Sequence, residues 1–245
     1  MRDEGSGTPV LLLHGFPDSG ALWRHQVAAL TQAGFRTIAP DLRGFGESDK
    51  PAEVEAYRLS NSVADMVAVL DALGVERAHV VGHDWGAALA WLFATMAPQR
   101  VEQLVVMSVG HFARPRSLAQ REKSWYMLLF QFEEAEAILR NGLLEEWAAS
   151  HPELPEFELT PGLNWYRANL HPRNELAPPR PVPPVQADTL GIWSTGDAYL
   201  LEPQMLESAQ FVAGAWRYER VEDAGHWLQL DQPERVNALL LDFLR

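Results

Sequence analysis

Short, wholly apolar runs alternate with longer amphipathic stretches over the first half of the chain. Val10–Leu13 is apolar at every position and ends at His14-Gly15, which is typical of a buried strand. Apolar residues recur at helical spacing over Ser60–Leu73, and Gly74 follows as a stop signal. The other elements expected in this half are helices over Trp23–Ala33 and Trp85–Met96, and strands over Phe35–Ala39, His79–Gly82 and Val101–Val109. This alternation predicts a parallel sheet covered by helices on both faces.

The alternation stops between Gly110 and Asp188, where no segment has the pattern of a strand. Helices are expected there over Ser117–Phe132, Glu134–Asn141, Leu143–Ser150 and Leu163–Leu170, followed by an extended proline-rich connector over Pro178–Pro184. Strands over Thr189–Ser194 and Trp216–Val221 and helices over Pro203–Phe211 and Pro233–Leu244 then resume the pattern. We therefore predict one α/β core, residues 1–109 and 189–245, with a helical lid inserted at 110–188.

Composition narrows the possible functions. The 245 residues contain 20 Lys and Arg against 33 Asp and Glu, a net charge of −13 that argues against nucleic acid as a partner. The chain has no cysteine, which excludes disulfides, thiol nucleophiles and cysteine-ligated metals, and we expect neither a metal nor a cofactor. No apolar run is long enough for a membrane span, and the acidic N-terminal segment is unlike a signal peptide. A cytoplasmic enzyme is expected, and a homo-oligomer stays open.

One strand-to-helix junction carries a candidate nucleophile. The segment Gly82-His83-Asp84-Trp85-Gly86 places Asp84 between two small residues, the spacing of a nucleophile elbow, in which a strained turn exposes one side chain at the edge of the sheet. The plainer alternative is that Asp84 only caps the helix that starts at Trp85.

Three further polar segments follow predicted strands. His14-Gly15-Phe16-Pro17 comes after the first strand, Gly196-Asp197 after the penultimate one, and Gly225-His226-Trp227 after the last. Because parallel strands end at the same edge of a sheet, these segments are expected to meet there. Either Asp197 or Asp223 could supply a carboxylate that pairs with His226, but Asp223 precedes that histidine too closely for the usual geometry.

Together with Asp41-Leu42-Arg43-Gly44-Phe45-Gly46-Glu47-Ser48, these motifs resemble the epoxide hydrolase and haloalkane dehalogenase branch of the α/β-hydrolase family, from about residue 8 to the C-terminus. The resemblance implies Asp84 as nucleophile, His226 as base, Asp197 as orienting acid, and the backbone N–H groups of Phe16 and Trp85 as the oxyanion hole. Family members usually begin with an antiparallel hairpin. We find no such hairpin in the sequence and expect about six parallel strands from Pro9 onward, with one open edge.

A carboxylate nucleophile suits displacement at a saturated carbon, where it forms an ordinary ester on Asp84 without first losing a proton. Water activated by His226 then attacks the carbonyl carbon of that ester, and Asp197 stabilises the imidazolium. Plain ester or amide hydrolysis is disfavoured, because a carboxylate attacking a carbonyl gives an anhydride.

The leaving group decides between two enzyme types, both acting on small molecules. An epoxide oxygen needs acidic O–H donors, and Tyr126 and Tyr166 lie in contexts similar to the tyrosine-bearing lid motifs of epoxide hydrolases. One group of haloalkane dehalogenases carries asparagine where this chain has Phe16, which has no side-chain donor for a halide. Haloacetate dehalogenases carry arginine where this chain has Trp85, so the usual cation for the substrate carboxylate is missing at that position. Epoxide opening is therefore favoured. Dehalogenation, with Arg114, Arg116 or Arg167 as a possible cation for a haloacid, and a non-catalytic ligand-binding homologue stay as alternatives.

The remaining polar residues of these motifs are expected to support the site. We expect His83 to hydrogen-bond beneath the nucleophile, His14 to support the oxyanion loop, and Asp41 and Arg43 to brace the loop that they begin.

Overall fold

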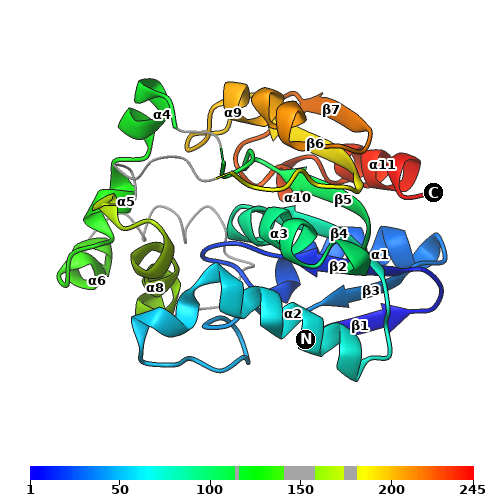
Figure 1. Cartoon of the computed structure of the whole chain (residues 1–245), viewed down its shortest axis with the longest axis horizontal. Helices are drawn as coiled ribbons and strands as arrows, with labels where there is room; N and C mark the ends of the chain where they lie inside the picture. The colour runs from blue at the N-terminus through cyan, green and yellow to red at the C-terminus, as the bar shows by residue number, and fades with distance from the viewer. Residues whose placement is uncertain (114–115, 141–157, 174–180) are drawn as a thin grey trace.

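Seven strands form one sheet in the order β1-β3-β2-β4-β5-β6-β7 (Figure 1). The computed structural model describes residues 1–113, 116–140, 158–173 and 181–245. The strands are β1 (Arg2–Gly5), β2 (Pro9–Leu13), β3 (Arg36–Ala39), β4 (Ala78–His83), β5 (Val101–Met107), β6 (Asp188–Ser194) and β7 (Trp216–Val221). Strands β2 to β7 all run parallel to one another, which confirms the predicted parallel sheet.

The edge beside β3 is covered by β1, so the expectation of an open edge was wrong. Strand β1 pairs antiparallel with β3, from Arg2 opposite Ala39 to Gly5 opposite Arg36. The Arg36 guanidinium also binds the Asp3 carboxylate through two hydrogen bonds of 2.8 and 2.7 Å. All four residues of β1 are exposed, so this strand has none of the apolar alternation by which a half-buried strand is recognised.

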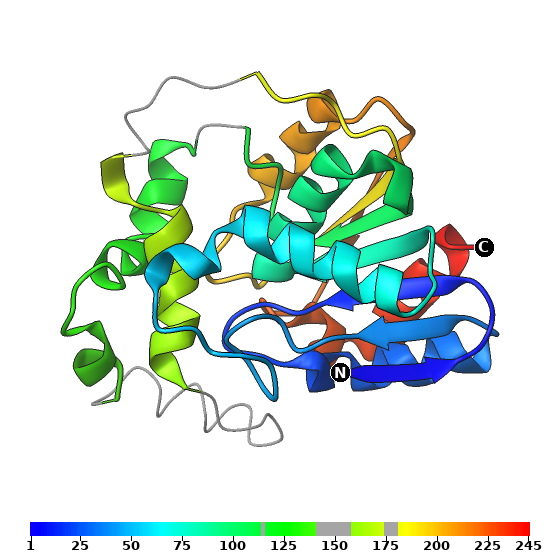
Figure 2. The same cartoon turned by 60° about the horizontal axis from the view of Figure 1, so that its bottom comes forward.

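Helices cover both faces of the sheet (Figure 2). Helices α2 (Leu59–Ala72) and α3 (Trp85–Met96) lie on one face, and α1 (Arg24–Gln32), α10 (Leu228–Asp231) and α11 (Pro233–Phe243) on the other. Alternate residues of β2 enter two separate cores: Leu11 and Leu13 pack with α2 and α3, whereas Val10 and Leu12 pack with α1 and α11. Helix α9 (Glu202–Leu206) and the 3-10 turn Glu207–Phe211 stand where one helix over Pro203–Phe211 was expected.

Among the described residues of the inserted segment, four helices lie beyond the carboxyl ends of the strands, and we call them the cap helices (Figure 1). They are α4 (Leu118–Lys123), α5 (Tyr126–Leu129), α6 (Ala135–Ile138) and α8 (Leu159–Asn169). The helix expected over Ser117–Phe132 is thus divided into two. Helix α8 begins before its expected start at Leu163, because Pro161 falls in its first turn, where a helix needs no amide donor. The helix expected over Leu143–Ser150 and the start of the proline-rich run lie outside the described residues.

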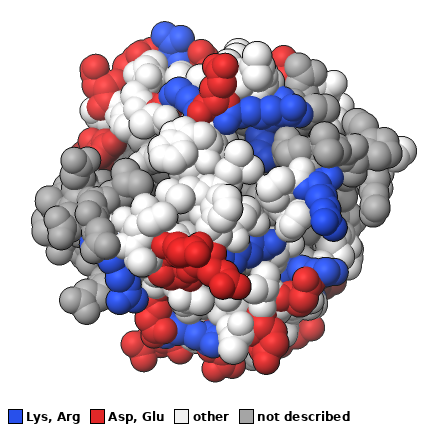
Figure 3. Space-filling view, turned by 90° about the vertical axis from the view of Figure 1, so that its left-hand side faces the viewer, with Lys and Arg blue, Asp and Glu red and all other residues white. Residues whose placement is uncertain are grey.

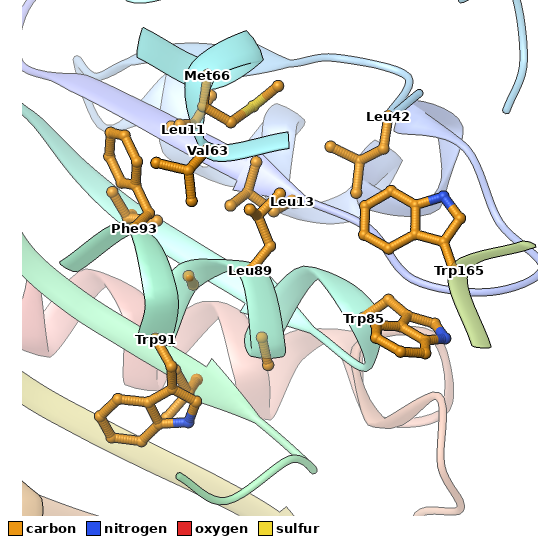
Figure 4. Close-up of a cluster of buried hydrophobic side chains, with 14 of the residues drawn as sticks. Leu11, Leu13, Leu42, Val63, Met66, Trp85, Leu89, Trp91, Phe93 and Trp165 are labelled. Carbon is orange, nitrogen blue, oxygen red and sulfur yellow. The ribbon is translucent and has the colours of Figure 1, made fainter. Parts of the chain in front are cut away.

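The cap helices pack onto the core through α8. Trp165 is fully buried, its ring centroid lies 5.6 Å from that of Trp85, and its indole donates to the Arg43 carbonyl at 2.9 Å. Figure 4 shows Trp165 beside Trp85 and Leu42, at one end of the cluster formed by β2, α2 and α3. In the described ranges, no helix is both long and apolar enough to cross a lipid bilayer.

Candidate active site

Asp84 occupies a strained turn between β4 and α3. Its backbone has φ 54° and ψ −121°, a region that non-glycine residues rarely adopt. A Cβ atom at Gly82 would collide with the Gly86 carbonyl, and one at Gly86 would collide with the Leu13 carbonyl, so the turn requires glycine at both positions. The Asp84 side chain makes no hydrogen bond that caps α3. The helix-cap alternative therefore does not account for this aspartate.

The two oxygen atoms of the Asp84 carboxylate have different partners. Oδ1 accepts a hydrogen bond of 2.8 Å from the backbone N–H of Phe16, in the loop that follows β2. Oδ2 lies 3.5 Å from Nε2 of His226. Among the described residues, these are the polar contacts of the carboxylate, so the Trp85 amide at the start of α3 stays a predicted second donor.

Asp197 holds the other ring nitrogen of His226. Its Oδ2 lies 2.9 Å from His226 Nδ1, and its Oδ1 accepts hydrogen bonds from the amides of Tyr199 and Leu200 at 2.8 and 2.9 Å. The Asp197 side chain has no exposed surface. The structure thus brings together Asp84, His226 and Asp197 from three strand ends, and His226 is paired with Asp197 rather than with Asp223.

The charges of this cluster stabilise one another. Burial works to lower the pKa of the His226 imidazole, but the carboxylates of Asp197 and Asp84 outweigh it and raise this pKa to about 10. Burial likewise works to raise the pKa of Asp197, but His226 and two backbone amides lower it to about 2. The pKa of Asp84 is also lowered, because its contacts with His226 and Phe16 outweigh its burial. At neutral pH the cluster is an imidazolium between two carboxylates.

A cavity of about 260 Å³ opens above Asp84. Tyr126 of α5 and Tyr166 of α8 both line it, and their ring centroids are 6.3 Å apart. Burial, reinforced by the charge of Asp84, raises the pKa of both phenols well above its ordinary value of about 10. Both tyrosines therefore keep their O–H protons at neutral pH and can donate hydrogen bonds into the cavity.

The cap helices and the residues that join them also carry much of the exposed apolar surface. Trp125, which lines the cavity, is 57% exposed, so the cavity reaches the surface beside it. Leu128 and Phe132 follow on the same segment and are exposed as well. Figure 3 looks onto this end of the molecule and shows uncharged atoms across its middle, with acidic and basic groups around them. An apolar substrate would meet a compatible surface at this entrance.

Three residues near the site have no counterpart in the predictions. Tyr199 lines the cavity with its ring centroid 5.2 Å from that of His226, and Lys123 lines it from the end of α4. Asp18 is 2% exposed and accepts a hydrogen bond of 3.0 Å from the Trp227 indole, while burial raises its pKa to about 7. The position of Tyr199 two residues after Asp197 was the only available signal. Neither Lys123 nor Asp18 belongs to a pattern that marks a site.

The polar residues expected to support the site make structural hydrogen bonds. Nε2 of His83 lies 2.8 Å from the backbone oxygen of His226, and burial lowers the pKa of His83 to about 3, so that this ring stays neutral. His14 accepts a hydrogen bond of 2.9 Å from the Leu42 amide. Asp41 accepts from the Gly20 amide at 2.8 Å, and Arg43 pairs with an aspartate of α2 at 2.6 Å.

Residues 8–137 match the family model for the alpha/beta hydrolase fold. The chain is 35% identical to Epoxide hydrolase 3 of Xenopus tropicalis over 96% of its own length and 71% of that protein. It is 32% identical to Epoxide hydrolase A of Mycobacterium tuberculosis over 97% of its length and 91% of that protein.

Solved structures give the same result. Epoxide Hydrolase A from Mycobacterium thermoresistibile is 30% identical with a TM-score of 0.80, and the match covers 99% of this chain and 93% of that one. The Bacillus megaterium epoxide hydrolase in complex with an inhibitor is 26% identical with a TM-score of 0.89, and the match covers 99% of this chain and 95% of that one. The chain therefore belongs to the α/β-hydrolase family, in the branch that contains the epoxide hydrolases.

Proposed function

We propose that this protein hydrolyses epoxides to vicinal diols through a covalent ester on Asp84. The main observation behind the proposal is that the two oxygens of the Asp84 carboxylate have different partners: the Phe16 N–H binds Oδ1, whereas Oδ2 faces His226. The curated relatives and solved structures named above are epoxide hydrolases, which supports the same reaction for this chain.

In the first step, Oδ2 of Asp84 attacks one ring carbon of the epoxide, and the C–O bond of the ring breaks. The departing oxygen takes a proton from Tyr126 or Tyr166, which is needed because an unprotonated alkoxide is a poor leaving group. An aspartate suits this step, since its lowered pKa keeps it ionised and ready to attack at neutral pH.

The second step hydrolyses the ester. Esterification removes the negative charge of Asp84, one of the two charges that raise the pKa of His226, so the imidazolium more readily releases its proton, which restores the O–H of the tyrosine that protonated the epoxide oxygen. Neutral His226 then takes a proton from water, which attacks the carboxyl carbon of Asp84. The negative charge that develops on Oδ1 is stabilised by the Phe16 N–H, with the Trp85 amide as second donor. As this intermediate collapses, the C–O bond to the substrate breaks and the leaving oxygen receives the remaining proton of the attacking water, which releases the diol and regenerates the Asp84 carboxylate.

We also propose that residues 110–188 act as a lid. The cap helices carry both tyrosines, and α8 is bound to the core by the Trp165 hydrogen bond to Arg43. This arrangement supports a role for the insertion in placing O–H donors opposite Asp84 and in shielding the ester from bulk water.

The test is a parallel assay of styrene oxide, 1-chlorobutane and fluoroacetate with the wild-type protein and the D84N variant. We expect diol from styrene oxide with the wild type, little or no halide from the other two compounds, and no turnover with D84N. Halide release without diol formation would instead assign the protein to the dehalogenases. Failure to convert any of the three, with ligand binding retained, would favour a non-catalytic homologue.

A further inference from the structure

Lys123 brings a cation into the cavity. It is the last residue of α4 and lines the same cavity as Asp84, Tyr126 and His226. Its Nζ donates a hydrogen bond of 2.9 Å to the backbone carbonyl oxygen of Asp197, and so links a cap helix to the loop that holds the His226 ring. An ammonium group has three N–H donors, and this carbonyl uses one of them.

The arginines that the sequence offered as cations for an acidic substrate are placed elsewhere. Arg167 forms an ion pair of 2.8 Å with Glu136, and Arg116 donates to the sulfur of Met127 at 3.0 Å. Neither arginine lines the cavity, and Arg114 lies outside the described residues. In the part of the chain that the structure describes, Lys123 and His226 are the basic residues of the cavity wall.

Lys123 also changes the charge that a substrate meets. The carboxylates of Asp84 and Asp197 with the His226 imidazolium sum to one negative charge, which would repel an anionic substrate from a partly desolvated cavity. The Lys123 ammonium cancels that charge. A carboxylate that reaches it gains a charge-assisted hydrogen bond.

We infer that Lys123 forms an anion subsite in this cavity, and that the substrates of the protein include epoxides bearing a carboxylate close to the ring. Lys123 ends α4 and Tyr126 begins α5 three residues later, and both line the cavity with Asp84. In the proposed binding mode Lys123 holds the carboxylate, Tyr126 donates its proton to the ring oxygen and Asp84 attacks a ring carbon. The inference rests on the proposed epoxide hydrolysis and names a substrate class for it.

The experiment compares two epoxides of similar shape, trans-3-phenyloxirane-2-carboxylate and trans-2-methyl-3-phenyloxirane, with wild-type, K123M and K123R proteins. The quantity measured is the ratio of kcat/KM for the carboxylate to kcat/KM for the methyl compound, because this ratio cancels the general effects of a variant on folding or on the Asp197 loop. We expect K123M to lower the ratio by roughly 10- to 100-fold, the value of a hydrogen bond to a charged group. K123R, which keeps the positive charge, should retain most of the wild-type ratio.

An unchanged ratio in K123M, with both epoxides still hydrolysed by the wild type, overturns the anion subsite alone. A fall in this ratio in K123R as large as that in K123M also overturns the anion subsite, since the effect would then not depend on the positive charge. A wild-type protein that hydrolyses styrene oxide or the methyl compound but not the carboxylate overturns the inference alone. A wild-type protein that hydrolyses none of these three epoxides overturns the proposed function, and the inference with it.

Discussion

Nε2 of His226 lies 3.5 Å from Oδ2 of Asp84, the oxygen opposite the one bound by the Phe16 amide. In the proposed mechanism the histidine therefore faces the oxygen that attacks the substrate, and the backbone donor faces the oxygen that becomes the oxyanion. Because this mechanism has His226 act only after the ester has formed, it predicts that the two steps of the reaction can be separated by mutation.

Replacing His226 by glutamine should trap the ester. The H226Q variant keeps Asp84 and both tyrosines but lacks the general base, so ester hydrolysis should slow by roughly 10²- to 10⁴-fold while alkylation persists. Intact-protein mass spectrometry after addition of styrene oxide should show one added substrate mass, located on the peptide that contains Asp84. The exposed His25 offers a control, since H25Q should accumulate no adduct. An unmodified H226Q protein would contradict the covalent mechanism.

Removing the hydroxyl of Tyr166 or Tyr126 should slow ring opening. Each phenol lines the cavity and keeps its proton, so Y166F and Y126F should each reduce the rate of alkylation by about 10²-fold for a lost proton donor. Stopped-flow single-turnover measurements isolate this step. The Tyr218 hydroxyl donates a hydrogen bond to Glu202 and does not line the cavity, so Y218F is the matched control. Alkylation at the wild-type rate in Y166F would remove this tyrosine from the proposed mechanism.

The rate of ester hydrolysis should depend on pH through the pKa of His226, which falls when Asp84 loses its charge on forming the ester. In the free protein the pKa of His226 is about 10, held there by Asp197 and Asp84 against burial. Once Asp84 is an ester, this pKa falls, and hydrolysis requires the neutral ring. The rate of ester breakdown in single turnovers should therefore rise with pH and level off through a pKa below that of the free protein. A rising limb at or above pH 10 would show that the charge of Asp84 does not matter.

Asp18 should make the protein less stable as the pH rises. Burial raises its folded-state pKa to about 7, whereas an unfolded aspartate titrates near 3.9. The folded protein therefore keeps a proton that the unfolded chain has lost, and the free energy of unfolding falls from about pH 4 to pH 7 and stays low above it.

D18N does not titrate and keeps an oxygen for the Trp227 indole. Its stability relative to the wild type should thus increase between pH 5 and pH 8 by roughly 3 kcal/mol, because the folded-state pKa of about 7 lies about two pH units above pH 5 and each unit contributes about 1.4 kcal/mol. Thermal unfolding at the two pH values measures this difference, and the exposed D223N is the control. An equal difference in Tm between D18N and wild type at both pH values would mean that Asp18 is already ionised at pH 5.

The sequence predicted the core of the site because each part of it is local. Asp84 follows β4 directly, Asp197 and His226 lie three and five residues beyond the ends of β6 and β7, and parallel strands end at one edge. Strand β1 was missed because both of its faces are exposed, which removes the apolar periodicity. Lys123 and Tyr199 were missed because they reach the cavity only through the packing of α4 and the loop after β6, which no spacing along the chain encodes.

In the proposed mechanism, water attacks the carboxyl group of Asp84 rather than the substrate. A single turnover of excess wild-type protein with styrene oxide in ¹⁸O-labelled water tests it directly, by mass spectrometry of the Asp84 peptide and of the diol. The proposed mechanism predicts that the label enters Asp84 while the first diol stays unlabelled. Label in the first diol and none in Asp84 would contradict it, since water would then have attacked the epoxide itself.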